Sequence, residues 1–103
     1  MIANMAQTDA DAPKRLTLTV DKASVAFVEF YLFGEVAIVT HTEVDVGHRG
    51  KGLGSIVASQ ALQRFRSEHC KVVPVCGFFL QHVRRCPEYS DLLTPSCRRI
   101  FAV

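Results

Sequence analysis

The N-terminal part of the chain alternates hydrophobic and polar residues in the way that is typical of β-strands. In residues 15–20, leucine and valine alternate with threonine, which predicts a strand with one buried face. Residues 24–33 are rich in β-branched and aromatic residues, so we expect a second strand that is covered on both sides or nearly so. Gly34 begins a tight turn, because glycine adopts a positive φ at no steric cost, and the alternation resumes over residues 36–44. The pattern predicts an antiparallel meander of three strands.

The period of the pattern changes after a glycine-rich stretch at residues 47–54. Hydrophobic or small residues then recur with helical spacing, at positions 54, 57, 58, 61, 62 and 65, which predicts an amphipathic helix that ends near His69. The polar positions between them are expected to face water; they are Ser55, Ser59, Gln63 and Arg66.

A second strand and helix follow. Residues 71–77 predict a short buried strand that contains Pro74. Proline cannot donate a hydrogen bond to a neighbouring strand, so we expect it where the sheet is open or splayed. Residues 78–86 predict a short helix that Pro87 stops, and the pattern assigns no element beyond that residue.

The order of predicted elements is strand, strand, strand, helix, strand, helix, which indicates an α+β fold with a mixed sheet. A helix between the third and fourth strands is the usual crossover of a parallel pair. We expect residues 14–103 to form a single domain, and residues 1–13, which show no periodicity, to form a mobile arm. No hydrophobic run approaches the roughly 20 residues that a membrane helix needs.

The composition fits one globular domain, since the chain has 103 residues of which 49% are hydrophobic and 21% charged. The formal net charge is only +2, but it is unevenly spread. Residues 1–50 hold four basic and seven acidic residues, whereas residues 51–103 hold eight and three. The basic half is either a solvated surface or a docking face for a polyanion such as a phosphorylated cofactor. No basic strand is interleaved with aromatic residues, which argues against nucleic acid as a partner.

Four cysteines, Cys70, Cys76, Cys86 and Cys97, stand 6, 10 and 11 positions apart. None has the C-x-x-C or paired Cys/His spacing of a zinc site, so we expect four free thiols and no metal. The N-terminal residues lack the charged and apolar regions of a secretory signal. These features predict a reduced compartment, the cytoplasm or the nucleus.

The glycine-rich segment Arg49-Gly50-Lys51-Gly52-Leu53-Gly54 lies at the junction between a predicted strand and a predicted helix. Glycines let the backbone approach a ligand closely, and the first N–H groups of a helix have no partner within the helix, so this junction suits a phosphate. The alternative is a loop that only turns the chain. The spacing matches neither the P-loop pattern nor the G-x-G-x-x-G dinucleotide pattern.

Arg49-x-x-Gly52-x-Gly54 matches the R/Q-x-x-G-x-G/A pyrophosphate signature of the GNAT superfamily of acetyl-CoA-dependent N-acetyltransferases. The segments at residues 41–44, 72–76 and 84–89 strengthen this match. Taken in order, the signature and these segments resemble the minimal single-domain (YjdJ-type) subgroup of that superfamily, over about Leu16 to Leu92.

The resemblance implies an enzyme that transfers an acetyl group from acetyl-CoA to an amine. In that family the pantetheine arm of the cofactor lies between two parallel strands that splay apart, here residues 36–44 and 71–77, and the pyrophosphate rests on the N–H groups of Arg49 to Gly54. A backbone N–H near Val44 would polarise the acetyl carbonyl. The implied cofactor-binding residues are Val44, Arg49, Gly50, Lys51, Gly52, Leu53, Gly54, Ser55, Cys76, Phe78 and His82.

Glu43 and His41 are the candidates for accepting a proton from the attacking amine. They are two positions apart on a predicted strand, so both side chains emerge on one face. The alternatives are an ion-paired or solvated Glu43 and a packed core histidine at position 41. Cys76 is the third candidate, because it ends the fourth predicted strand beside the same gap. It either accepts the acetyl group covalently or lines the cofactor channel.

Two departures from the larger relatives shape the expected reaction. Residues 78–86 hold no tyrosine to protonate the departing thiolate, so His82, Cys76 or water would serve. Only Asp21 to Ala23 stands where larger relatives insert two helices that select the acceptor, which implies an open, shallow acceptor site. We expect direct transfer in a ternary complex, by a monomer or weak dimer, to an exposed amine on a small molecule or on a protein or peptide lysine such as a histone tail. The alternative function is a CoA-binding module with little or no turnover.

Overall fold

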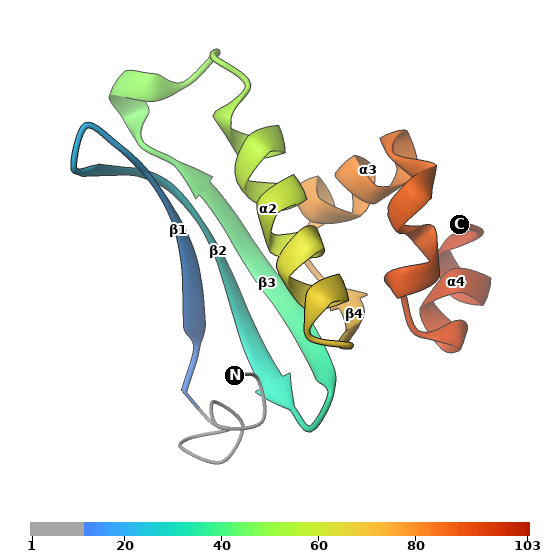
Figure 1. The fold of residues 1–103 in the computed structure, drawn as a ribbon. Coiled ribbons are helices and arrows are strands. Elements are labelled where there is room, and N and C mark those ends of the chain that lie inside the picture. The colour runs from blue at the N-terminus through green and yellow to red at the C-terminus, as the bar shows by residue number, and fades with distance from the viewer. Residues whose placement is uncertain (1–11) are drawn as a thin grey trace.

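The computed structural model describes residues 12–103, so most of the predicted arm at residues 1–13 lies outside the described residues. One sheet has the strand order β1-β2-β3-β4, formed by β1 (Lys14–Val20), β2 (Ala23–Phe33), β3 (Val36–Val44) and β4 (Lys71–Pro74). The first three strands are antiparallel, and β4 runs parallel to β3 (Figure 1). Gly34 turns the chain between β2 and β3 with a φ of 60°, as predicted. The predicted α+β fold is confirmed.

The helices lie on one side of the sheet (Figure 1). The longest, α2 (Leu53–Ser67), packs against β2 and β3. From the end of β4 the chain continues through α3 (Gly77–Arg85), the 3-10 helix η2 (Pro87–Leu92) and α4 (Pro95–Phe101). A further 3-10 turn, η1 (Val46–His48), connects β3 to the loop before α2. Within residues 12–103, no helix is long and apolar enough to cross a membrane.

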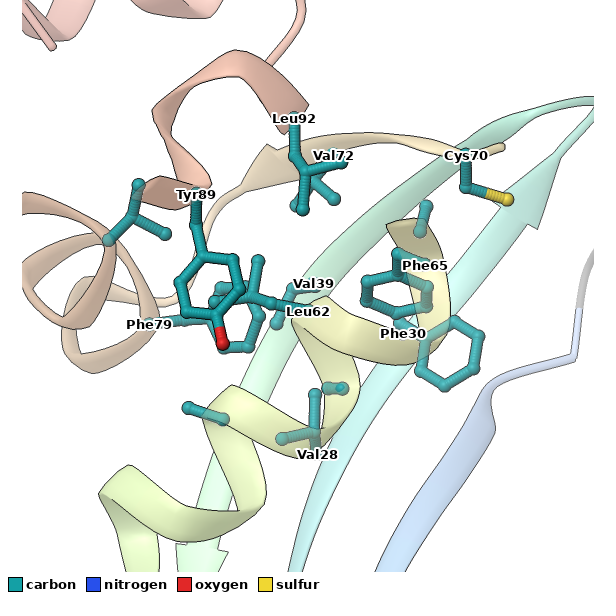
Figure 2. Packing of buried hydrophobic residues seen from close by; sticks show 14 of the residues in the cluster. Val28, Phe30, Val39, Leu62, Phe65, Cys70, Val72, Phe79, Tyr89 and Leu92 are labelled. Atoms are coloured by element: carbon teal, nitrogen blue, oxygen red, sulfur yellow. The ribbon is translucent and has the colours of Figure 1, made fainter. Parts of the chain in front are cut away.

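The core lies between α2 and the sheet. All six positions of the predicted hydrophobic stripe are buried, namely Gly54, Val57, Ala58, Ala61, Leu62 and Phe65. The ring of Phe65 meets that of Phe30 on β2 edge-on, with centroids 5.0 Å apart. Figure 2 shows Leu62 and Phe65 of α2 among side chains from the strands and from the C-terminal segments, including Val28, Val39, Phe79 and Tyr89. Each such fully buried side chain contributes about 1.5–3 kcal/mol to folding.

One face of β2 is less covered than the sequence predicts. The residues that face α2, among them Val28 and Phe30, are buried, whereas Phe27 and Glu29 on the other face are only half-buried. Cover on that second face comes from a neighbouring strand, since the Arg15 guanidinium lies over the Phe27 ring at 4.1 Å. The sequence predicts cover on both sides or nearly so; the cover is complete toward α2 and partial on the other face, where Val25 is buried but its neighbours are only half-buried. On this second face of β2, large side chains of neighbouring strands pack against one another, and no second layer of helices is needed to explain the hydrophobic residues there.

The last part of the chain, to which the sequence pattern assigns no element, forms η2 and α4. Arg66 on α2 holds η2 in place, donating to the Asp91 carboxylate at 2.9 and 3.0 Å and to the Glu88 carbonyl at 2.7 Å. The hydrogen bond from Arg66 also keeps the pKa of Asp91 below its ordinary value. At the start of α4, the hydroxyl of Thr94 accepts a hydrogen bond from the Cys97 N–H at 3.3 Å, which caps the helix.

Candidate cofactor and active site

The parallel strands β3 and β4 are paired over only half of β3. Their register joins residues 36–39 of β3 to residues 71–74 of β4. The N–H groups of Val75 and Cys76 then both donate to the carbonyl of Val39, at 2.9 and 3.0 Å, and the chain leaves the sheet to begin α3. The predicted splayed pair is thus present. The fourth strand ends at Pro74, three residues earlier than predicted, because Val75 and Cys76 share one acceptor, the Val39 carbonyl, and the chain then turns into α3. Lys71 and Val75 donate toward β3, so Pro74 lies where its missing N–H faces away from that strand.

A β-bulge in β3 lies where the pairing with β4 ends. Glu29 of β2 is opposite His41 while the next residue, Phe30, is opposite Val39, so Thr40 is the extra residue. The Thr40 hydroxyl donates to the carbonyl of Glu29 at 3.4 Å. A bulge bends the strand and increases its twist, which directs the second half of β3 away from β4.

The backbone of the second half of β3 faces this open edge. Asp45 donates its N–H to the Val25 carbonyl of β2 at 2.7 Å. Successive residues of a strand direct their N–H and C=O groups to opposite sides, so those of Thr42 and Val44 point to the open edge. The Arg49 guanidinium reaches the Val44 carbonyl at 3.4 Å, in agreement with this orientation.

A pocket of about 210 Å³ lies next to the open edge, at the start of α2. Its lining residues are Val44, Arg49, Gly50, Gly52, Leu53, Gly54, Ser55 and Phe78. All eight belong to the predicted cofactor-binding set, and the same set also contains Lys51, Cys76 and His82, which do not line the pocket. Pockets that enclose drug-sized ligands measure about 300–1,000 Å³, so this one suits part of a larger ligand.

The pocket is suited to an anion. Gly52 is the N-cap of α2 with a φ of 75°, and no side chain caps the helix. The first N–H groups of a 15-residue helix and the positive end of its dipole therefore face the pocket. Arg49 adds a positive charge to the lining, and the exposed Lys51 adds a second beside it.

Gly54 sets how closely α2 and α3 approach at the inner wall of the pocket. A Cβ atom at this position would lie 2.8 Å from Cζ of Phe78 and 3.5 Å from Cγ2 of Val44. Only glycine therefore lets the Phe78 ring, which is 44% exposed, rest against the first turn of α2.

His82 lies behind the pocket, between α2 and α3. Its side chain is buried, and Nε2 is 2.8 Å from the Ser59 hydroxyl and 3.9 Å from Sγ of Cys86. Burial lowers the pKa of His82, and the charge of Arg85 lowers it further. Ser59 is half-buried against this histidine and does not simply face water as predicted.

Cys76 is the N-cap of α3 and is half-buried. Its Sγ lies 3.6 Å from Oγ1 of Thr42, so the two side chains meet across the gap between the strands. Thr42 was not among the sequence candidates, although it is the residue between His41 and Glu43 and so has to project to the opposite face. All four cysteines are free, and residues 12–103 contain no cluster of three or more metal-binding side chains.

His41 and Glu43 project together from the face of β3 that α2 does not cover. Nε2 of His41 is 2.8 Å from Oε1 of Glu43, and each side chain is 52% exposed. The prediction that they share a face is confirmed, and a packed core position for His41 is wrong. The His41 ring also lies 5.9 Å from that of Phe27. Strand β3 thus carries an imidazole–carboxylate pair on one face and Thr42 on the other, where Thr42 meets Cys76 of the α3 N-cap.

Residues 15–92, which make up most of the described chain, match the family model of the GCN5-related N-acetyltransferases. The chain belongs to this family. The sequence motif predicts that a GCN5-related N-acetyltransferase has a splayed pair of strands beside a glycine-rich helix start, and this chain has both features. No curated protein sequence matches the chain.

Solved structures share the fold. The chain is similar to a ribosomal-protein-alanine N-acetyltransferase from Brucella melitensis biovar Abortus 2308, with 24% identity and a TM-score of 0.60 over 81% of this chain and 66% of that one. A ribosomal-protein-S18-alanine N-acetyltransferase from Escherichia coli has 17% identity and a TM-score of 0.51, over 64% and 43%. An aminoglycoside antibiotic 6'-N-acetyltransferase from Acinetobacter haemolyticus has 15% identity and a TM-score of 0.50, over 87% and 67%. The chain thus spans about two thirds or less of these proteins' length.

Proposed function

We propose that this chain transfers the acetyl group of acetyl-CoA to an exposed amine, by direct transfer in a ternary complex. The observation that carries this proposal is the position of the anion-suited pocket beside the open edge of β3, in a chain of the GCN5-related family. Acetyl-CoA supplies an acetyl group activated as a thioester.

The chain fits this cofactor at the glycine-rich loop. A Cβ atom at Gly50 or Gly52 would meet nothing within 4 Å, so both glycines leave space there. The N–H groups at the start of α2, with Arg49 and Lys51, would hold the pyrophosphate. The open edge at Thr42 and Val44 would bind the pantetheine arm, and the Val44 N–H would stabilise negative charge on the acetyl oxygen.

The His41–Glu43 pair would take the proton that the amine loses as its nitrogen forms a bond to the acetyl carbon and the carbon–sulfur bond breaks. Water at the open edge would protonate the leaving thiolate, because His82 is buried against Ser59. We assign Cys76 to the channel wall, since a thioester and an amine already suffice for direct transfer. Incubation with acetyl-CoA alone should therefore add no acetyl mass of about 42 Da to the chain. A hydroxylamine-sensitive adduct at Cys76, lost in Cys76→Ser together with turnover, would contradict this assignment.

The acceptor would reach His41 and Glu43 from the uncovered face of the sheet. That face is open to solvent, which favours an amine on a protein or peptide lysine, or a small amine, over an acceptor enclosed in a deep pocket. The similar structures are named for different acceptors, the alanine of a ribosomal protein and an aminoglycoside. A turnover assay with acetyl-CoA and a panel of peptides and polyamines identifies the class.

Cofactor binding is tested by calorimetry with CoA, for which we expect micromolar affinity. Gly52→Asp places a negative charge at the pocket and should weaken CoA binding at least about tenfold. Gly34→Asp is the matched control, because Gly34 also has a positive φ with open space around it but lies in the hairpin between β2 and β3. Equal CoA affinity in the two folded variants would contradict the site.

The second candidate function is a CoA-binding module with little turnover. It is favoured by one observation, the lack of a tyrosine in α3 to protonate the thiolate. CoA binding without acetylation of any acceptor in the panel would support the binding module over the enzyme.

A further inference from the structure

A small pocket lies beside Glu43, at the end of β3 that is not paired with β4. Its volume is about 110 Å³, and we call it the outer pocket, to distinguish it from the cofactor pocket at the start of α2. The start of β2 and the end of β3 supply its lining, which consists of Ser24, Val25, Ala26, Phe27, Glu43 and Asp45. Pockets that enclose whole ligands measure about 300–1,000 Å³, so the outer pocket suits one end of a chain.

The outer pocket and the cofactor pocket lie on opposite faces of β3. They share no lining residue, yet Val44 of the cofactor pocket stands between Glu43 and Asp45 of the outer pocket. Asp45 has an extended backbone, with φ −55° and ψ 140°, so the alternation of side chains continues through it. Glu43 and Asp45 therefore both point to the uncovered face, from which the proposed acceptor approaches.

Each carboxylate of the outer pocket has one oxygen engaged and one open. Oε1 of Glu43 is 2.8 Å from Nε2 of His41. Oδ2 of Asp45 is 3.2 Å from Nδ1 of His48 and accepts a hydrogen bond from the Gly47 N–H at 3.3 Å. Within residues 12–103, Oε2 of Glu43 and Oδ1 of Asp45 accept no hydrogen bond, so both remain available to a ligand.

No lysine or arginine of the described chain forms an ion pair with these two carboxylates. The guanidinium of Arg15, which lies over the Phe27 ring, pairs with Glu29 instead. Phe27 also gives the outer pocket an apolar wall beside its carboxylates. An ammonium group at the end of a hydrocarbon chain matches this lining, because its charge suits the carboxylates and its methylene groups suit the ring.

The spacing of the carboxylates indicates a ligand with two amines. Glu43 and Asp45 are two positions apart on extended backbone, which corresponds to about 7 Å along the strand. A short alkyl chain between two amines covers such a span. We infer that the outer pocket binds the second ammonium group of an alkyl diamine or polyamine whose first amine is the acetyl acceptor, an inference that rests on the proposed acetyl transfer. Asp45 would hold the ammonium that does not react, beside the His41–Glu43 pair that takes the proton of the amine that does.

The first test measures binding without turnover. The full chain is titrated with 1,4-diaminobutane and with 4-amino-1-butanol, in which a hydroxyl replaces the second amine, and is followed by ¹H–¹⁵N NMR. Saturable shifts from the diamine should concentrate in residues 24–27 and 43–48. Its affinity should be at least about fivefold higher than that of the amino alcohol, because only a second ammonium pairs with a carboxylate. Equal affinities, or shifts confined to other residues, would overturn the inference whatever the turnover assay gives.

The second test compares the same two amines as acceptors of the acetyl group. With acetyl-CoA, kcat/KM should be at least about fivefold higher for the diamine, through a lower KM. Equal kcat/KM values would overturn the inference and leave the proposed acetyl transfer standing. If no amine or peptide is acetylated, the proposed function fails, and the binding comparison still decides whether the outer pocket takes a dication.

Two variants locate the charge that the second ammonium uses. Asp45→Asn removes the charge, but asparagine can still accept from the Gly47 N–H and cap η1, and the preference for the diamine should fall at least about threefold. Glu35→Gln is the matched control, because it removes the same charge from an exposed residue at the other end of the nine-residue β3, well beyond a Debye length of about 8 Å. It should change the preference less than about 1.5-fold.

Equal losses of preference in the two variants would mean attraction by the net charge alone and would overturn the inference. If Asp45→Asn does not fold, the comparison of the diamine with the amino alcohol on the unaltered protein still decides.

Discussion

β3 is one continuous strand, yet the two halves of its outer edge face different surroundings. From Val36 to Val39 the edge is hydrogen-bonded to β4, and Ala37 and Val39 are fully buried. From Thr42 to Val44 the edge faces the gap between the strands, and its neighbours are side chains of the cofactor pocket and of Cys76. The comparison teaches that one strand contributes to the core at one end and to a site at the other. The bulge at Thr40 and the end of β4 mark the boundary between the two halves.

The largest effect is expected in the second half, at Glu43. Glu43→Gln keeps the shape of the side chain and removes its basicity, so turnover should fall about 10-fold to 1,000-fold while CoA affinity stays unchanged. Steady-state kinetics and calorimetry measure the two quantities.

Glu29→Gln is the matched control for this prediction. Glu29 lies on the same uncovered face, opposite His41, but pairs with Arg15 at 3.3 Å. Glu29→Gln should therefore change turnover by less than about twofold, because the loss of an exposed ion pair costs little stability. Unchanged turnover in Glu43→Gln from pH 6 to pH 9 would leave His41 or water as the proton acceptor.

A substitution in the first half should act on stability instead. Val39 is 0% exposed, and Val39→Ala should lower the free energy of unfolding by about 1–3 kcal/mol, through lost burial and the cavity left behind. Thr42→Ala, in the second half, should lower it by less than about 1 kcal/mol, because Thr42 is only half-buried. Urea unfolding measures both, and equal losses would remove the distinction between the two halves.

The smallest effect is a pH dependence from His82 on α3, the helix that follows β4 at the gap. Burial holds the pKa of His82 in the folded protein below its ordinary value of 6.5. The unfolded chain therefore binds more protons as the pH falls below about 6.5, and the free energy of unfolding should decrease with it. Urea unfolding at pH 7 and at pH 5 measures the change.

His82→Gln should flatten this dependence, because glutamine does not titrate and can still bond to Ser59. The other charges that act on His82 are Arg85, which lowers its pKa, and Glu88, which raises it. The Asp91 carboxyl adds to the slope only near or below its ordinary pKa of 3.8, because its own pKa is lowered in the folded protein. An identical slope in the parent and in His82→Gln would assign the dependence to other groups.

Much of the fold could be predicted because its elements have clear periods. The stripe of α2 was predicted residue by residue, since a helix of 15 residues repeats its period several times. Five of the pocket residues lie in the glycine-rich segment at residues 49–54, whose motif depends on local backbone geometry, and the family resemblance supplied Val44, Ser55 and Phe78. The alternation of β3 correctly placed His41 and Glu43 on a common face.

The rest depended on contacts between distant segments. The end of β4 at Pro74 and the bulge at Thr40 arise from how two strands fit together, which no single strand reveals. The seven-residue α4 is too short to show a helical period. The position of η2 depends on the ion pair of Arg66 and Asp91, which are far apart in the sequence. The contact of Cys76 with Thr42, on the face of β3 opposite to Glu43, follows from the same fit.

The extra residue at Thr40 also decides on which face of β3 His41 and Glu43 lie. In a regular β3 without the bulge, side chains would alternate from the buried Val39. Counting by twos from Val39, His41 and Glu43 would turn inward against α2. Burying such ionisable groups costs several kcal/mol per charge. The bulge therefore keeps the imidazole and the carboxylate on the solvent side without that penalty, and a ligand that binds beside Thr42 and Val44 has no strand pairing to break.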